Sequence, residues 1–194
     1  MSAPCPQPQN GTIMKRMTLP LSCLLAASSL GLGACSNDTP KEPQAVESPS
    51  QAASVIEPCD LVTQAEAEAI LGEPLKPGER SEQQVVGLKL CLYNPQDENS
   101  TAFLQVTLTQ PSFMPAGGLP PSELFHSIRD AMAEGRTDLD NFGDEAFIAT
   151  GGLYILDGEH YITIGAGNID RPEIQERLKA AGKKALENLA ARTR

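Results

Sequence analysis

Apolar positions recur at two spacings along the chain, and each spacing predicts one kind of element. Residues 101–109 alternate apolar and polar side chains with a period of two, which predicts a β-strand with one buried face. A second strand is predicted around residues 85–93, with a turn over residues 94–100. Asp157-Gly158 separates two further apolar runs and predicts a hairpin with a type I′ turn, in which both central residues have positive φ.

The other spacing, three to four residues, predicts helices. Thr63 and Glu66 form a capping box, and Gly72 is expected to end the short helix that follows. Its acidic residues Glu66 and Glu68 are expected to face solvent. A second helix is predicted to begin with Ser122 as its N-cap and to bury Leu124, Phe125, Ile128 and Met132.

A third helix is predicted near the end of the chain, with Asp170 as its N-cap and Pro172 in its first turn. Its apolar stripe is expected to contain Ile174, Leu178, Ala181, Ala185 and Leu189. Helix, two strands, helix, strands and helix in this order predict an α+β fold, an antiparallel sheet packed with about three helices.

The first 34 residues have the features of a secretory signal. The basic pair Lys15-Arg16 precedes an apolar run over residues 19–32, and small residues precede Cys35. The tetrad Leu-Gly-Ala-Cys resembles a lipobox, the site where bacterial lipoproteins are cleaved before a lipidated cysteine. We therefore interpret residues 1–34 as a signal peptide, residues 1–13 as a start assigned upstream of Met14, and Cys35 as the lipid carrier. The alternative is a buried apolar helix ending at an ordinary cysteine, which the small residues at its end disfavour.

A lipidated Cys35 would anchor the chain to a membrane without a transmembrane helix. Ser36 follows it, where an Asp would argue for inner-membrane retention in Gram-negative lipoproteins, so the outer membrane is favoured in a cell that has one. Residues 36–57 are rich in Pro, Ser, Gln, Glu and Ala and predict a flexible linker. We expect residues 35–57 to be the anchor and linker, and residues 58–194 to be a single domain.

Two cysteines remain after the leader and the lipidated residue are set aside. Cys59 and Cys91 form an even pair, which in an oxidising compartment predicts a disulfide contributing roughly 3 kcal/mol in the chain-entropy model. The alternative is a redox or metal-binding dithiol, but the Cys-x-x-Cys spacing typical of such sites is absent from the sequence.

The composition restricts the class of partner. The formal net charge is −10, and loss of Lys15 and Arg16 with the leader makes it more negative. Such a surface repels phosphate backbones, and no basic patch is present, so nucleic acid is not expected as a partner. The chain has no Trp and few other aromatic residues, which weighs against a platform that stacks on sugars.

Three short motifs carry a resemblance. "PCDLVTQAEAEAILGEPL" at residues 58–75, "CLY" at 91–93 and "FGDEAF" at 142–147 are similar to small bacterial lipoprotein domains typified by actinobacterial families of unknown function. The resemblance covers residues 57–166. It implies a paired-cysteine α+β domain with a Gly-Asp-Glu-Ala turn before a hairpin, and it implies no known reaction.

Few residues offer catalytic chemistry. His126 is expected to be exposed on the second helix, and neither it nor His160 lies in a nucleophile motif. His160 lies near Asp157 and Glu159, which permits a surface metal site, but strand alternation more simply makes it a solvent-facing residue. Adjacent Asp144 and Glu145 are expected to point to opposite sides, which hinders cooperation between the two carboxylates. We predict neither a metal nor another cofactor.

These observations predict a non-enzymatic, lipid-anchored envelope protein that presents a small accessory or protein-binding domain to another envelope protein or envelope component. The candidate binding face is the Pro/Gly loop at residues 111–121 with the hairpin, and its candidate residues are Phe113, Met114 and His160. Phe113 and Met114 could instead fold back onto the core. An alternative function is a small-ligand carrier with a pocket between sheet and helices. A third, a hydrolase, would require titratable groups that converge in a cleft.

Overall fold

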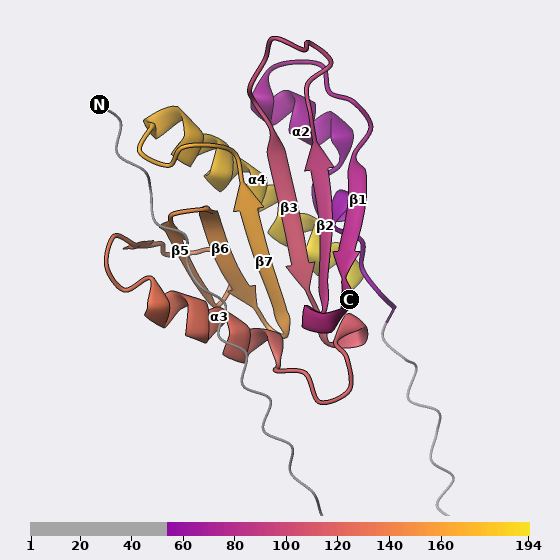
Figure 1. Cartoon of the computed structure of the whole chain (residues 1–194), viewed down its shortest axis with the longest axis vertical. Coiled ribbons are helices and arrows are strands. Elements are labelled where there is room, and N and C mark those ends of the chain that lie inside the picture. The colour runs from indigo at the N-terminus through magenta and orange to yellow at the C-terminus, as the bar shows by residue number, and fades with distance from the viewer. Residues whose placement is uncertain (1–53) are drawn as a thin grey trace, which may run out of the picture. The chain divides into compact units, whose positions relative to one another are not determined.

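A computed structural model describes residues 54–194 of the chain (Figure 1). The predicted signal peptide, Cys35 and nearly all of the linker lie outside the described residues. The described part contains one seven-stranded antiparallel sheet with strand order β1-β2-β3-β7-β6-β5-β4. Its strands are β1 (Glu79–Gln83), β2 (Leu88–Tyr93), β3 (Leu104–Thr109), β4 (Thr137–Asp138), β5 (Glu145–Ala149), β6 (Gly152–Asp157) and β7 (His160–Gly165).

The predicted α+β fold on an antiparallel sheet is confirmed. Residues 54–194 hold four α-helices where about three were expected, and the additional one is a single turn before the predicted first helix. The helices are α1 (Pro58–Leu61), α2 (Gln64–Leu71), α3 (Pro121–Ala131) and α4 (Pro172–Arg192), and two short 3-10 helices are η1 (Gln84–Val86) and η2 (Pro111–Phe113).

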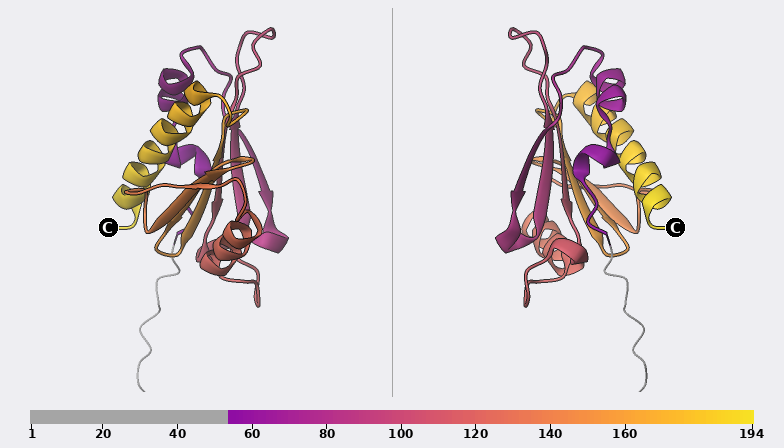
Figure 2. Two further views of the ribbon diagram at one scale, coloured as in Figure 1. Left: turned by 90° about the vertical axis from the view of Figure 1, so that its left-hand side faces the viewer. Right: turned by 90° about the vertical axis from the view of Figure 1, so that its right-hand side faces the viewer.

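Strand β6 shows how the sheet divides the core. Successive side chains of a strand point to opposite faces. Leu153 and Ile155 join the larger apolar cluster, which includes the stripe of α4 and residues of α1 and α2, whereas Tyr154 and Leu156 join a smaller cluster with α3. Helices α1, α2 and α4 therefore cover one face of the sheet, and α3 packs on the other, as the side views in Figure 2 show.

The long helix α4 buries the predicted stripe. All five expected residues are buried, namely Ile174, Leu178, Ala181, Ala185 and Leu189. Gly182 lies on the same side, and a Cβ at this position would come within 2.6 Å of Leu153 Cδ2. The missing side chain thus allows α4 to lie close to β6. The prediction of which α4 residues face the core is confirmed.

The predicted N-caps of α3 and α4 are wrong. These helices begin at Pro121 and Pro172, and neither N-cap residue, Pro120 or Arg171, makes a side-chain capping hydrogen bond. Proline at the first helical position needs no N–H partner and has its φ preset for the helix. Ser122 therefore lies inside the first turn of α3 instead of capping it, and Asp170 lies one residue before the actual N-cap of α4.

The predicted capping box of α2 is confirmed. The Thr63 side chain accepts a hydrogen bond from the Glu66 N–H, and the Glu66 side chain accepts one from the Thr63 N–H at 2.9 Å. Glu66 also accepts a hydrogen bond from Asn188 of α4 at 3.1 Å. Glu68 accepts one from the Leu75 N–H at 3.1 Å. The expectation that both carboxylates simply face solvent is therefore wrong, because each binds back to the domain.

The strand predicted around residues 85–93 begins later than expected. Val85 and Val86 belong to η1, and β2 begins at Leu88. Strand β1 was not predicted, because its five residues are all exposed and give no alternation of apolar and polar positions. The strand predicted over residues 101–109 is present from Leu104, and its alternating Leu104, Val106 and Leu108 are fully buried.

The β6–β7 hairpin is confirmed, but its turn differs from the predicted one. Asp157 pairs with His160, so the central residues are Gly158 and Glu159. Gly158 has a φ of +55°, whereas Glu159 is not among the residues with positive φ. Positive φ at the first central position alone is typical of a type II′ turn, so the type I′ prediction is wrong.

The predicted disulfide is present. Cys59 of α1 and Cys91 of β2 are joined across a sequence separation of 32 residues. Tyr93, two residues further along the same face of β2, donates a hydrogen bond to the Val62 carbonyl at 2.7 Å. One covalent bond and one hydrogen bond thus fix the segment that contains α1 to the sheet.

Candidate functional site

Helices cover only part of one face of the sheet. On that face α3 packs against β6 and β7, and none of the α-helices formed by residues 54–194 lies in front of β1, β2 and β3 in Figure 1. We call this region the uncovered face. Its residues are Glu79, Ser81 and Gln83 of β1, Leu88, Leu90 and Leu92 of β2, Gln105 and Thr107 of β3, and Thr163 of β7.

The strand register places these residues in rows. Ser81, Leu90, Thr107 and Thr163 lie side by side on four neighbouring strands. The three leucines of β2 are half-buried, whereas Cys91 and Tyr93, on the opposite face of the same strand, are 0% and 2% exposed. The same strand therefore buries one set of apolar side chains fully and leaves the other partly open to solvent.

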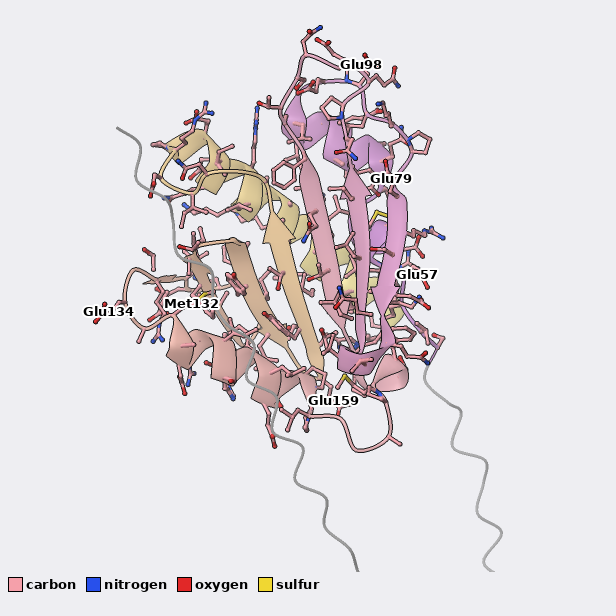
Figure 3. All side chains as sticks on the ribbon, in the orientation of Figure 1. Glu57, Glu79, Glu98, Met132, Glu134 and Glu159 are labelled. Atoms are coloured by element: carbon pink, nitrogen blue, oxygen red, sulfur yellow. A yellow bond between two sulfur atoms is a disulfide. The ribbon has the colours of Figure 1, made fainter. Side chains whose placement is uncertain are left out.

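The uncovered face has the composition of an interface core. A line of leucine side chains is flanked by hydroxyl and amide groups, and the one formally charged residue of the face, Glu79, lies on the edge strand β1. Interfaces between proteins deplete charged residues at their centre and place them at the rim. Glu79 lies opposite Leu92 on this face, at the outer side of the sheet, where Figure 3 labels it. A partner can therefore cover the leucines while the Glu79 carboxylate stays at the solvated rim of the face.

A surface cavity of about 620 Å³ continues the uncovered face at one end. It shares Leu92 and Gln105 with that face, and Phe103 completes its apolar wall. Polar groups come from the loop between β2 and β3, where Figure 3 shows Glu98 at the outer end. In this loop Asp97 accepts a hydrogen bond from the Asn99 N–H at 2.9 Å, which lowers the pKa of the Asp97 carboxyl. The cavity thus joins an apolar wall to an acidic rim.

The predicted loop and hairpin residues lie near one another, at the other end of the sheet. His160 is half-buried and lines a cavity of about 320 Å³ together with Pro111 and Ser112 of η2. Phe113 and Met114 are also half-buried. The Lys89 ammonium lies 4.7 Å from the centroid of the Phe113 ring, and Met114 lies against Gly87, so both side chains contact the domain.

Lys89 connects this end of the sheet to the start of the described chain. Its ammonium lies 2.8 Å from Glu57 and 3.0 Å from Glu82, and only 12% of its side chain is exposed. The hydrogen bond to Glu57 is the main cause that raises the pKa of Lys89. Two carboxylates and the Phe113 ring thus surround the ammonium, and we interpret the cluster as structural.

The strongest cluster of titratable groups lies between α3 and β5. Glu145 accepts a hydrogen bond from His126 Nε2 at 2.9 Å and one from Arg129 Nη1 at 2.6 Å. The His126 bond is the main cause that lowers the pKa of Glu145, and Arg129 lowers it further against partial burial. Sequence reasoning expected an exposed His126 and missed this contact, since nothing in the sequence indicates that α3 lies on β5.

The neighbouring carboxylates Asp144 and Glu145 do separate as expected. Asp144 accepts a hydrogen bond from the Gly158 N–H of the hairpin turn at 2.8 Å, whereas Glu145 binds α3. Each carboxylate thus joins β5 to a different element. The hydrogen bonds of His126 and Arg129 to Glu145 fix α3 to the sheet.

Neither a metal centre nor a membrane span is present in residues 54–194. In that range no three His, Cys, Asp or Glu side chains converge as ligands of an ion. No helix of the same range has the length and apolar character needed to cross a bilayer.

No family model, curated protein or solved structure matches the chain at a significant level.

Proposed function

We propose that this chain is a lipid-anchored, non-enzymatic envelope protein that binds another envelope protein through the uncovered face. The observation that supports the proposal is the line of half-buried leucines, Leu88, Leu90 and Leu92, on a face that no α-helix of residues 54–194 covers. Burying these side chains against a partner would contribute roughly 25 cal/mol per Å² of apolar surface removed from water.

The proposed localisation in the cell envelope is supported by the leader and the disulfide. The lipobox-like tetrad that ends at Cys35 supports cleavage and lipidation outside the cytoplasm, and Ser36 supports the outer membrane as the final location in a Gram-negative cell. A disulfide between Cys59 and Cys91 is typical of proteins that fold in an oxidising compartment. These two features point to the same side of the membrane.

The carrier hypothesis places a pocket between the sheet and the helices. That space is occupied by packed side chains, among them Leu61, Leu104 and Leu153, which are all fully buried. A ligand there would have to displace core residues at a cost of several kcal/mol. The 620 Å³ cavity lies on the other face and opens onto the uncovered face, where it extends a partner surface.

A hydrolase would require a nucleophile beside a base. In residues 54–194 both cysteines are in the disulfide, and the His126 ring is hydrogen-bonded to Glu145, not to a serine or threonine hydroxyl. A base is expected to lie within hydrogen-bond reach of its nucleophile. This arrangement supports a binding function over a reaction.

The proposal is tested by photocrosslinking in the native envelope. A benzophenone side chain is placed at Leu90 of the full chain and, as the matched control, at Lys183, which is exposed on α4. We expect one protein to be captured at Leu90 and not at Lys183, and the same protein to bind the purified full chain. Equal capture at both positions, or binding that survives Leu90→Asp, would refute it.

A further inference from the structure

Strand β1 forms one edge of the sheet. It pairs with β2 on one side, and its other side has no strand neighbour among residues 54–194. All five of its residues are exposed, whereas the strand at the opposite edge, β4, has only two residues. An exposed edge strand offers unpaired N–H and C=O groups to a strand of another chain. Strand β1 is therefore the better docking edge.

The charges on β1 are complementary to those of a second, antiparallel copy. In a two-fold arrangement centred on Ser81, Arg80 lies opposite Glu82 of the second copy, and Glu79 lies opposite Gln83. The two-fold axis repeats the Arg80–Glu82 pair, so the interface gains two opposite-charge pairs. Such cross-strand pairs stabilise a sheet.

Other registers are disfavoured. Centring the axis on Arg80 places Arg80 opposite itself, and centring it on Glu82 places Glu82 opposite itself, so both create like-charge pairs. A shift by one residue in the pairing would place side chains from opposite faces of the sheet against each other. The sequence of β1 thus selects the register centred on Ser81.

The charged side chains are available for this contact. Arg80 is 59% exposed, and its only ion-pair partner among residues 54–194, Asp60, lies 4.0 Å away. Glu82 is 55% exposed and binds Lys89 through one oxygen, Oε2. Arg80 and Glu82 point to the same face of the sheet because they are two residues apart on one strand. They can therefore pair across the axis without breaking a buried contact.

We propose that two copies of this chain associate through their β1 strands, antiparallel and centred on Ser81, to form one continuous sheet. Because a two-fold axis perpendicular to the sheet keeps its faces, the uncovered faces of the two copies lie on the same side. This dimer goes beyond the proposed binding function and does not depend on it. It doubles the surface that a partner can contact.

The test uses the full chain purified in detergent. Ser81→Cys places two thiols opposite each other at the axis, within the Cα separation that a disulfide requires. We expect mild oxidation to give a covalent dimer, in which mass spectrometry identifies a disulfide between the two introduced thiols. Ser127→Cys, at an exposed position of α3, is the matched control and is expected to give no such dimer.

Charge reversal tests the register. Either Arg80→Glu or Glu82→Arg in the Ser81→Cys chain makes two attractive pairs repulsive, and we expect the dimer to weaken on the order of tenfold. The double variant Arg80→Glu/Glu82→Arg restores opposite charges and is expected to restore the disulfide-linked dimer. Failure of the double variant to do so would overturn the proposed register.

Sedimentation equilibrium of the unsubstituted full chain tests whether a dimer forms at all, and this part of the test does not depend on the folding of a variant. The proposal predicts a concentration-dependent dimer, and Glu82→Arg is expected to shift it to monomer. A monomer at every concentration, or a dimer that neither charge reversal weakens, would overturn the pairing of β1 strands. Binding of an envelope partner to the uncovered face is measured separately, so either proposal can fail alone.

Discussion

The side-chain amide of Gln110 binds both backbone groups of Ile56. Its Nε2 donates to the Ile56 carbonyl at 2.7 Å, and the Ile56 N–H donates to its Oε1 at 2.8 Å. Gln110 is 1% exposed and directly follows β3. A glutamine side chain thus takes the place of a strand neighbour and fixes the chain to the sheet where the predicted linker ends.

This contact predicts that removing the Gln110 amide lowers the protection of nearby backbone N–H groups against hydrogen exchange. Gln110→Ala leaves two buried backbone groups of Ile56 without partners, at a cost of about 2 kcal/mol or more. We expect lower resistance to urea and faster hydrogen exchange at Ile56. Gln84→Ala, at an exposed position of η1, is the matched control and should change neither. Unchanged exchange at Ile56 would contradict the role of Gln110.

The disulfide is expected to contribute a large share of the stability. Replacing Cys59 and Cys91 together by Ser opens a loop with a sequence separation of 32 residues. The chain-entropy model gives a loss of about 3 to 4 kcal/mol in the free energy of unfolding. Chemical denaturation of both proteins measures it. A difference below about 1 kcal/mol would show that the loop is already ordered without the bond.

Tyr93 predicts a loss of stability at high pH. Burial raises the pKa of its phenol from 10.0 to about 12 in the folded chain. Above pH 10 the unfolded chain loses this proton while the folded chain keeps it, so stability is full below pH 10 and declines as pH rises toward 12. Burial raises the pKa of Tyr161 to about 12 as well, which adds to the decline.

The Tyr93→Phe variant separates the contribution of Tyr93 to the loss of stability at high pH from that of Tyr161. The variant loses the hydrogen bond to the Val62 carbonyl, so we expect about 1 kcal/mol less stability at neutral pH. Between pH 10 and 12 its stability should decline less steeply than that of the unsubstituted protein. Denaturation curves across this range are the measurement, and parallel declines in the two proteins would contradict the raised pKa of Tyr93.

Two glycines with positive φ allow a controlled comparison of Gly→Ala substitutions, one at a crowded position and one at an open position. Gly152 has a φ of +141°, and a Cβ there would lie 1.9 Å from the Ile164 carbonyl oxygen of β7. Gly117 has a φ of +77°, but a Cβ there would meet no atom within 4 Å. We expect Gly152→Ala to cost about 3 to 5 kcal/mol and Gly117→Ala about 1 kcal/mol, from backbone strain alone. Equal thermal shifts would contradict the close approach of β6 and β7.

The sequence predicted best those elements whose pattern is local. The apolar stripe of α4, the capping box of α2 and the turn residue Gly158 each lie within one element, so their spacing alone indicates the structure. The Cys59–Cys91 pair followed from counting the cysteines that remain if the leader is removed and Cys35 is lipidated. Strand β1 could not be found in this way, because all of its side chains are exposed.

The candidate site depends on long-range placement, which spacing does not encode. In the segment Leu88–Tyr93 the leucines alternate with Lys89, Cys91 and Tyr93, and apolar residues on both faces of a strand indicate that both are at least partly shielded. That pattern could have directed attention to β2. It cannot indicate that α3 packs on β6 and β7 and leaves β2 open, because this requires the order of strands in the sheet.

The affinity of the full chain for the protein captured at Leu90 tests the central claim most directly. Leu90→Asp places a charge in the middle of the uncovered face, and Lys183→Asp makes a charge change on α4 as the control. We predict a loss of at least about tenfold in affinity for Leu90→Asp, with native circular dichroism, and no change for Lys183→Asp. Equal affinities for all three proteins would contradict binding through the uncovered face.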